Sequence, residues 1–293
     1  MARESTGTKH AQSAMEYLMT YGWAILIIAV VLGALFELGF FNSANLAPKV
    51  PPGSCQVYRP QGPGTTAFES LEGTCNNELP QYTGQFDGVN SNINIPYNPI
   101  DDIFNGGSFT ISMWIKANDP PPIEGLYAQQ YNTIDEQLLI QGTSGEPYVE
   151  DPGSWAYSDI NVFDNRWHYL AVTFSSTGAN TITFYLDGKY DGSGSGALFV
   201  PQATQFYIGT DRLTGAFFSG SIANVQVYNT SLSTNEIQAI YQEGIGGVPL
   251  DLNNLVGWWP LNGNANDYSG NQNNGVPGNV IFTTSWASSY SAP

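Results

Sequence analysis

The chain has very few basic residues. Its 293 residues include only 8 lysines and arginines but 25 aspartates and glutamates, which gives a formal net charge of −17 at pH 7. Because proteins bind the phosphates of nucleic acids through basic surfaces, this composition argues against a nucleic-acid partner. Acidity is compatible with solubility or with divalent-cation binding, and composition alone does not decide between them.

Cysteine and histidine are also scarce. The two cysteines, Cys55 and Cys75, are close in sequence, whereas the two histidines, His10 and His168, lie far from them. This spacing argues against a zinc site. In a segment outside the cell, a disulfide between Cys55 and Cys75 is expected, and it would stabilise the fold by roughly 3 kcal/mol. Two buried thiols are the alternative.

The sequence has only one long hydrophobic run, which lies near the amino terminus. Residues 12–41 contain an apolar stretch from Trp23 to Phe36. About 25 helical residues, each rising about 1.5 Å, are enough to cross a bilayer. No clear small-residue cleavage site follows the run, although Ala11 stands directly before it. Glu16 lies at the head of this expected helix, where a carboxylate costs free energy in lipid unless it is paired.

The peptide KHAQSAMEYL at this point resembles the class III signal of archaeal type IV pilins and archaellins. The resemblance implies that residues 1–11 are a leader, which a prepilin-type peptidase removes between Ala11 and Gln12. The helix at 12–41 would be kept and would pack with other pilin subunits in a filament core. Glu16 would then set the register between neighbours, with the free amine of a neighbouring Gln12 as its partner. A plain membrane anchor is the alternative.

Three further regions follow the hydrophobic run. Residues 42–54 contain several prolines and predict a linker, because proline neither continues a helix nor fits a central strand. Residues 55–84 are rich in glycine, proline and threonine and predict a loop region that the disulfide would hold in place. From there on, short extended runs separated by turns predict one β-sandwich over residues 85–293.

Alternation of apolar and polar residues predicts the individual strands. In SFTISMWIKA, Phe109, Ile111 and Met113 share one face and Trp114 lies on the other. Asp187-Gly188 predicts a tight turn between two strands. Further strands are expected in NINIPY, WHYLAVTFSS, TITFYL, QFYIGT, SIANVQVYN and the last fifty residues.

One short helix is expected among these strands. Ser233 and Glu236 have the spacing of a capping box, and Ile237 and Ile240 form an apolar stripe at helical spacing. Gly244 is a plausible end. The helix should pack on the sandwich.

Five segments form an ordered set: GGSFTISMWIKA, NRWHYLAVTF, ITFYLDGKYDGSGSG, FYIGTDRLTGAFFSGSIANVQVYNTSLSTNEIQAIY and LVGWWPLNGNANDYSGNQNNG. Together they resemble the laminin G-like family of concanavalin A-like lectin and glucanase jelly rolls over about residues 80–285. The resemblance implies a mainly β fold behind the amino-terminal helix. In this family the GWWPLNGNANDYSGN-type strand normally opens the domain, whereas here it closes the chain. A circularly permuted sandwich is therefore expected, and a truncated second copy is the alternative.

Many members of this family hold a structural calcium ion near the loop that matches residues 266–273. Carboxylate and carbonyl oxygens are the ligands that Ca²⁺ prefers. Asp267 is the first candidate ligand, with Asn271 and Asn273 beside it. The alternative is an asparagine-rich turn without metal. This alternative is favoured by Ala223-Asn224, which replaces an acidic pair that relatives often carry in another strand.

Carbohydrate binding is the second role that the resemblance implies. Lectin-like sandwiches stack exposed aromatic rings on sugars. Trp155, Tyr157, Tyr148 and Tyr131 lie in residues 118–160, where we expect variable loops. The alternative is that these rings pack under the loops. Asn229 begins the sequon Asn-Thr-Ser and is a candidate glycosylation site.

Catalysis is not expected. The E-x-D-x-x-E run of jelly-roll hydrolases is absent, and Glu146, Glu150 and Asp151 fall beside prolines in an expected loop. Nucleophile elbows, phosphate loops and zinc spacings are absent as well. The sequence therefore predicts a structural and adhesive subunit of a type IV pilus-like surface filament, made from a single-pass membrane precursor, with a head that binds surface carbohydrate. A membrane-anchored sugar-binding protein that does not polymerise is the first alternative, and a secreted glycoside hydrolase is the second.

Overall fold

The computed structural model describes residues 21, 24–32, 54–60, 66–72, 80–96, 107–118, 123–131, 134–151, 154–177, 180–196, 205–211, 215–291 and 293. The chain divides into two compact units, residues 1–50 and residues 51–293.

In the first unit, residues 24–32 are helical, as predicted for this part of the hydrophobic run. The leader at 1–11, the expected processing residues Ala11 and Gln12, and Glu16 lie outside the described residues. Within the part of the chain that is described, no helix has both the length and the apolar character needed to span a membrane.

The second unit begins with a hairpin of β1 (Ser54–Pro60) and β2 (Thr66–Glu72), which pair antiparallel. The structure therefore has strands within the region where loops were expected. Cys55 lies opposite Leu71 in the register of this hairpin. Cys75 lies outside the described residues, so the disulfide stays a prediction.

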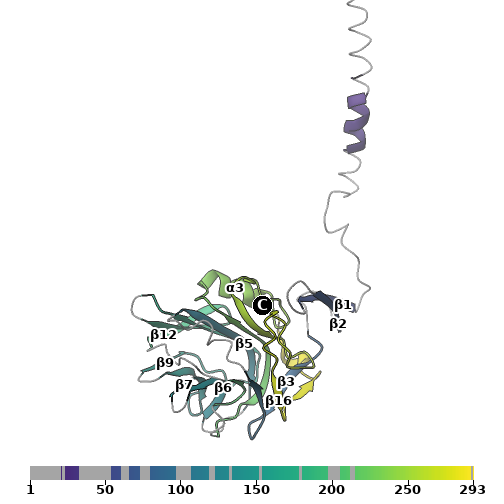
Figure 1. Ribbon diagram of the computed structural model, residues 1–293. Helices are drawn as coiled ribbons and strands as arrows, with labels where there is room; N and C mark the ends of the chain where they lie inside the picture. Colours follow the sequence, from purple (N-terminus) through teal and green to yellow (C-terminus); the bar gives the residue numbers. More distant parts are fainter. Residues whose placement is uncertain are drawn as a thin grey trace, which may run out of the picture. The chain divides into compact units, whose positions relative to one another are not determined.

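Two antiparallel sheets then form a β-sandwich (Figure 1). The eight-stranded sheet has the order β12-β11-β10-β5-β14-β3-β17, and β15 also pairs with β14. Its strands are β3 (Thr83–Asp87), β5 (Phe109–Ala117), β10 (His168–Ser175), β11 (Thr181–Leu186), β12 (Lys189–Ser195), β14 (Ser219–Tyr228), β15 (Leu255–Trp259) and β17 (Ile281–Thr283).

The seven-stranded sheet has the order β16-β4-β13-β6-β7-β8-β9. Its strands are β4 (Asn92–Ile95), β6 (Ile123–Tyr131), β7 (Ile134–Gln141), β8 (Pro147–Asp151), β9 (Ser154–Tyr157), β13 (Gln205–Ile208) and β16 (Val276–Gly278).

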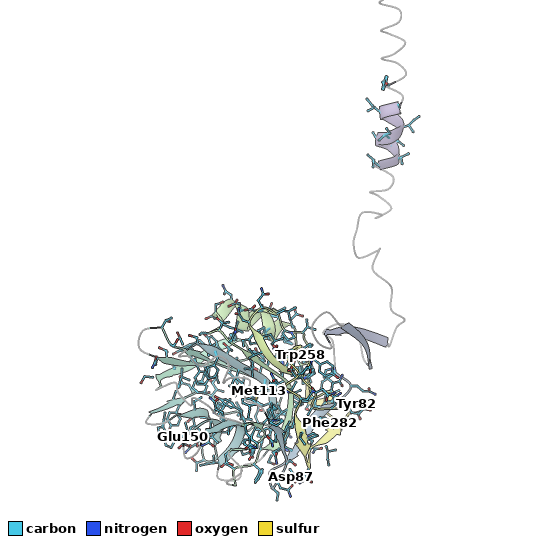
Figure 2. All side chains as sticks on the ribbon, in the orientation of Figure 1. Tyr82, Asp87, Met113, Glu150, Trp258 and Phe282 are labelled. Carbon is cyan, nitrogen blue, oxygen red and sulfur yellow. The ribbon has the colours of Figure 1, made fainter. Side chains whose placement is uncertain are left out.

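Apolar side chains from both sheets fill the space between them. Phe109, Ile111 and Met113 of β5 are buried in this core, which confirms the face predicted for them. Met113 is labelled in Figure 2. Trp259 and Leu261 belong to the same core. Because sheet side chains alternate between faces, burial on this side leaves the other face of β5 for a second layer.

The carboxyl-terminal segment completes this sandwich and does not begin a second one. β14 pairs along its length with β5 on one side. On its other side, residues 219–222 pair with β3 and residues 225–228 pair with β15. This is the arrangement that the permuted interpretation requires, while the relation to the strand order of the family stays a prediction.

A second apolar cluster covers the outer face of the eight-stranded sheet. Trp114, Tyr169, Tyr228 and Trp258 project there and are buried. The helix α3 (Thr234–Gln242) covers them, together with the segment that contains the 3-10 helix η2 (Ala287–Ser289).

The predicted helix signals of α3 are confirmed. The Ser233 hydroxyl accepts a hydrogen bond from the Glu236 N–H, and the Glu236 carboxylate accepts one from the Ser233 N–H at 2.7 Å. Ile237 and Ile240 are buried. The helix ends at Gln242, and Gly244 follows with a positive φ of 79°.

The region between residues 118 and 160 contains four strands, β6 to β9, so the prediction of variable loops there was wrong. Leu138, Leu139 and Ile140 are all buried, and such a run hides the alternation that identifies a strand. Pro147 is the first residue of β8, a position where a strand tolerates proline.

Candidate functional site

Three of the predicted sugar-binding aromatics come together at one edge of the seven-stranded sheet. Tyr148 of β8 lies opposite Tyr157 of the edge strand β9, and Glu150 lies opposite Trp155. The Tyr148 ring is 5.5 Å from the Tyr157 ring and 5.7 Å from the Trp155 ring, centroid to centroid, with interplanar angles of 20° and 4°. We call Tyr148, Trp155 and Tyr157 the aromatic platform.

The platform faces away from the core. Val149 and Ala156, which alternate with its residues along β8 and β9, are buried between the sheets. Tyr148 is 1% exposed, whereas Trp155 is 53% exposed and Tyr157 is 42% exposed. Two rings at the surface are therefore held against a third, buried ring.

Polar side chains continue the platform across the sheet. Glu150 is half-buried beside Trp155, and Gln137 of β7 lies opposite Glu150 on the same face. Burial, with smaller effects of Glu150 and Tyr157, raises the pKa of Tyr148 to about 12. The Tyr148 phenol therefore stays protonated at neutral pH.

Close contact with the other sheet holds β9 in place. A Cβ atom on Gly194 of β12 would lie 2.7 Å from the Cβ of Ala156, and one on Gly192 would lie 2.7 Å from the Tyr157 carbonyl oxygen. Only glycine permits this approach. The buried Ser158 hydroxyl donates to the Asp191 carboxylate just beyond β9. These contacts fix the strand that carries both exposed rings.

One other tyrosine of this region does not join the platform. Tyr127 is buried in the core, where it stacks on Phe206 at 5.5 Å. Tyr131 ends β6 opposite Ile134, and its side chain lies outside the described ones.

The predicted calcium loop is a dense hydrogen-bonded turn. The Asp267 carboxylate accepts from the N–H groups of Trp258, Ser269 and Asn273 and from the Ser269 hydroxyl, at 2.8 to 3.0 Å. The amide groups of Asn271 and Asn273 donate to the Val256 carbonyl oxygen. Among the described residues, no group of three or more histidines, cysteines or carboxylates could hold a metal ion. Binding of calcium here stays a prediction, and a cation would have to compete with four donors for Asp267.

Asn224, one of the two residues expected in place of an acidic pair, has a structural role. Its side-chain oxygen accepts from the Trp258 indole N–H at 2.7 Å and from Gln226 at 3.1 Å, and its amide donates to the Gly247 carbonyl at 2.8 Å. Asn229, the candidate glycosylation site, is exposed.

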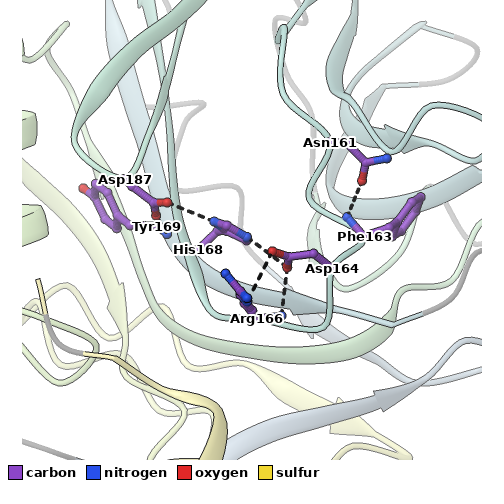
Figure 3. A network of polar contacts seen from close by, with 7 residues as sticks. All are labelled: Asn161, Phe163, Asp164, Arg166, His168, Tyr169 and Asp187. Carbon is purple, nitrogen blue, oxygen red and sulfur yellow. Dashed lines mark hydrogen bonds and ion pairs between the residues drawn. The ribbon is translucent and has the colours of Figure 1, made fainter.

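One polar cluster was not recognised from sequence as part of a site. His168 lies between two carboxylates, with its Nδ1 3.0 Å from Asp187 and its Nε2 3.1 Å from Asp164 (Figure 3). The hydrogen bond with Asp187 is the main reason that the pKa of His168 is raised. His168 and Trp114 both line a surface cleft. The cleft residues come from five separate parts of the sequence, so no single local motif marks them.

Comparisons with known proteins agree on the fold. A Bacteroides ovatus protein provisionally described as carbohydrate binding aligns with a TM-score of 0.54 and 16% identity, over 74% of this chain and 66% of its own. A heptameric pentraxin from Limulus polyphemus aligns with a TM-score of 0.50 and 12% identity, over 69% of this chain and 94% of its own. Among curated proteins, none matches.

The family model of the concanavalin A-like lectin/glucanases superfamily matches residues 87–238, just over half of the chain. The matched range includes β5 to β14 and therefore both sheets of the sandwich. The chain belongs to the concanavalin A-like lectin/glucanases superfamily.

Proposed function

We propose that this domain binds carbohydrate and that the aromatic platform is its contact surface. The observation that carries the proposal is the pair of half-exposed rings, Trp155 and Tyr157, stacked on the buried Tyr148. A sugar ring has a face of C–H groups that packs on an aromatic ring, whose face is electronegative. Glu150 lies on the same face of the sheet and is half-buried beside Trp155, where its carboxylate can accept hydrogen bonds from a sugar's hydroxyl groups.

The charge of the protein narrows the ligand class. A net charge of −17 repels acidic polysaccharides from the surface at a distance. The carboxylate of Glu150 can accept hydrogen bonds from the hydroxyl groups of an uncharged sugar. We therefore propose neutral glycans as ligands. The similarity to the Bacteroides ovatus protein supports a carbohydrate ligand without identifying it.

A neutral-glycan panel tests this proposal. The full-length chain, kept in a detergent without a sugar headgroup, should bind at least one neutral glycan. Trp155→Ala should weaken that binding at least tenfold, which corresponds to about 1.4 kcal/mol. Tyr190→Ala is the matched control, because Tyr190 is 61% exposed but lies on β12 of the other sheet. No binding, or equal binding by both variants, would refute the platform; hydrolysis of the glycan would indicate an enzyme instead.

We further propose that the domain is displayed at the cell surface as a pilin-like subunit. The support is the peptide around Ala11, the hydrophobic run at 12–41 and the helix at 24–32. Sequencing of the mature amino terminus should find Gln12 first, and an intact Met1 would contradict processing.

Assembly can be tested separately from display. Glu16→Ala should abolish filaments if Glu16 sets the register of neighbouring helices. If filaments are never found and the variant is displayed normally, the protein is a simple membrane anchor for its sugar-binding domain.

A further inference from the structure

A cleft of about 610 Å³ lies on the opposite side of the sandwich from the aromatic platform. It is at the outer face of the eight-stranded sheet, between α3, the turn before β10 and the carboxyl-terminal segment. Its lining includes Trp114, Arg166, His168, Asp187, Tyr241 and Tyr290. Small-ligand sites typically measure about 300–1,000 Å³ and combine aromatic walls with a few polar groups. The cleft therefore has the size and composition of such a site.

The polar wall of the cleft is held rigidly. His168 is fixed on both ring nitrogens by Asp164 and Asp187 (Figure 3). Asp187 also accepts a hydrogen bond from the Tyr169 N–H at 2.9 Å, which ties the β11–β12 turn to β10. A site whose side chains are already ordered loses little entropy when a ligand binds.

The aromatic wall is equally constrained. Tyr241 of α3 stacks on Trp114 at 5.7 Å and 23°, and Tyr290 packs edge-on against Trp114 at 5.4 Å. The Tyr290 hydroxyl accepts a hydrogen bond from the Ile245 N–H at 3.1 Å. The carboxyl-terminal segment is thereby attached to the end of α3, and the two together form one side of the cleft.

The charges in the cleft favour a neutral, hydroxylated ligand. The Arg166 side chain is 80% exposed and has donors to offer, while the Asp187 side chain is 36% exposed and its carboxylate accepts. Hydroxyl groups can satisfy both kinds of partner at once. An organic cation would meet Arg166 and would not reach the face of Trp114, which is 2% exposed. An anion would meet the Asp187 carboxylate and a protein of charge −17.

We propose that this cleft is a second carbohydrate subsite, which binds a neutral pyranose residue independently of the aromatic platform. The inference rests on the proposed function in one respect, that the ligand class of the domain is carbohydrate. The sugar would occupy the space beside Tyr241 and Tyr290, with its hydroxyl groups bonded to Arg166 and Asp187. One domain would then hold two glycan segments on opposite sheets.

Blocking the cleft tests the inference with little risk to the fold. Ser291 lines the cleft and is exposed, so Ser291→Trp should fill it without removing a buried contact. Asn235→Trp is the matched control, because Asn235 is exposed on α3 and does not line the cleft. Arg166→Ala is a second cleft variant that removes a donor and adds no bulk. Thermal unfolding of each variant would show that it remains folded.

Binding is measured in the full-length Trp155→Ala background, which removes the platform. The probes are the methyl glycosides of glucose, galactose, mannose and N-acetylglucosamine, followed by ligand-detected NMR. At least one glycoside should still bind, Ser291→Trp and Arg166→Ala should each weaken it at least tenfold, and Asn235→Trp should leave it unchanged.

The possible results separate the two proposals. If Trp155→Ala alone abolishes glycoside binding that the unmodified chain shows, the platform stands and the cleft subsite is overturned. The cleft subsite is also overturned if neither cleft variant weakens the residual binding. Binding of tetramethylammonium in the cleft without binding of any glycoside would overturn it as well. If no neutral sugar binds the unmodified chain, both proposals fail.

Discussion

Glu124 of β6 makes the stability of this protein depend on pH in an unusual direction. The residue is fully buried, and burial raises the pKa of its carboxyl group from the ordinary 4.5 to about 8, an effect that the backbone of Ser219 only partly offsets. The folded protein therefore keeps this proton through neutral pH, whereas the unfolded chain releases it above pH 4.5. Because the folded state binds more protons between these values, the free energy of unfolding falls as pH rises through this window.

The size of the effect follows from the shift. Each pKa unit corresponds to about 1.36 kcal/mol, so the rise from 4.5 to about 8 removes on the order of 5 kcal/mol by pH 9. Glu124→Gln cannot titrate. Because the unfolded chain has already released most of this proton at pH 5, the free energy of unfolding of the variant should gain about 4 kcal/mol on the wild type between pH 5 and pH 9. Any constant cost of the extra amide hydrogens drops out, because only the change with pH is compared.

Urea denaturation at five pH values from 5 to 9 measures this difference. Asp87→Asn is the control. Burial is the largest single effect and raises the pKa of Asp87, but the hydrogen bonds from Asn90, Val89 and Ser91 together outweigh it and lower the pKa to about 2. Asp87 is then ionised across the whole range, and its variant should run parallel to the wild type. Parallel curves for Glu124→Gln and the wild type would refute the reasoning.

Three further substitutions probe the fold. His168→Gln should lose stability mainly at acid pH, as thermal unfolding at several pH values would show. Because the pKa of His168 is raised in the folded state, protonated His168 stabilises the fold fully below pH 6.5. This stabilisation is lost as pH rises through the pKa of the folded state. Asn224→Ala should cost about 3 kcal/mol in urea unfolding, because it leaves the buried Trp258 indole without its acceptor and removes two other hydrogen bonds; a loss under 1 kcal/mol would contradict this role. Ser233→Ala should cost about 1 kcal/mol by removing the helix cap, and an unchanged midpoint would contradict it.

Local patterns predicted much of the sandwich. In β5 the strict alternation placed Met113 inward and Trp114 outward, and the structure confirms both sides. The turn at Asp187-Gly188 joins β11 and β12 with positive φ at both residues, as the dipeptide predicts. These features depend on a few neighbouring residues, so they can be read without knowing the tertiary structure.

The candidate sites depend on contacts between distant residues, and here sequence reasoning reached less far. Trp155, Tyr157 and Tyr148 were candidates because they are aromatic, but their assembly depends on the β8–β9 register, which the prediction of loops did not contain. Glu150 alternates with Tyr148 and could have been added once the strand was recognised. The cleft brings together Trp114 and Tyr290, which no sequence window covers.

The way β14 is paired has a consequence for how the protein is made. Both ends of the domain meet on one side of this strand, and β17 also pairs with β3 across almost two hundred residues of sequence. Contacts of such separation form slowly, because the chain between them must first be closed into a loop. Trp259 belongs to the core between the sheets, so this core is incomplete until that residue has been synthesised. A chain interrupted before Trp259 lacks part of its own core, so we expect proteases to degrade it more readily than the full-length chain.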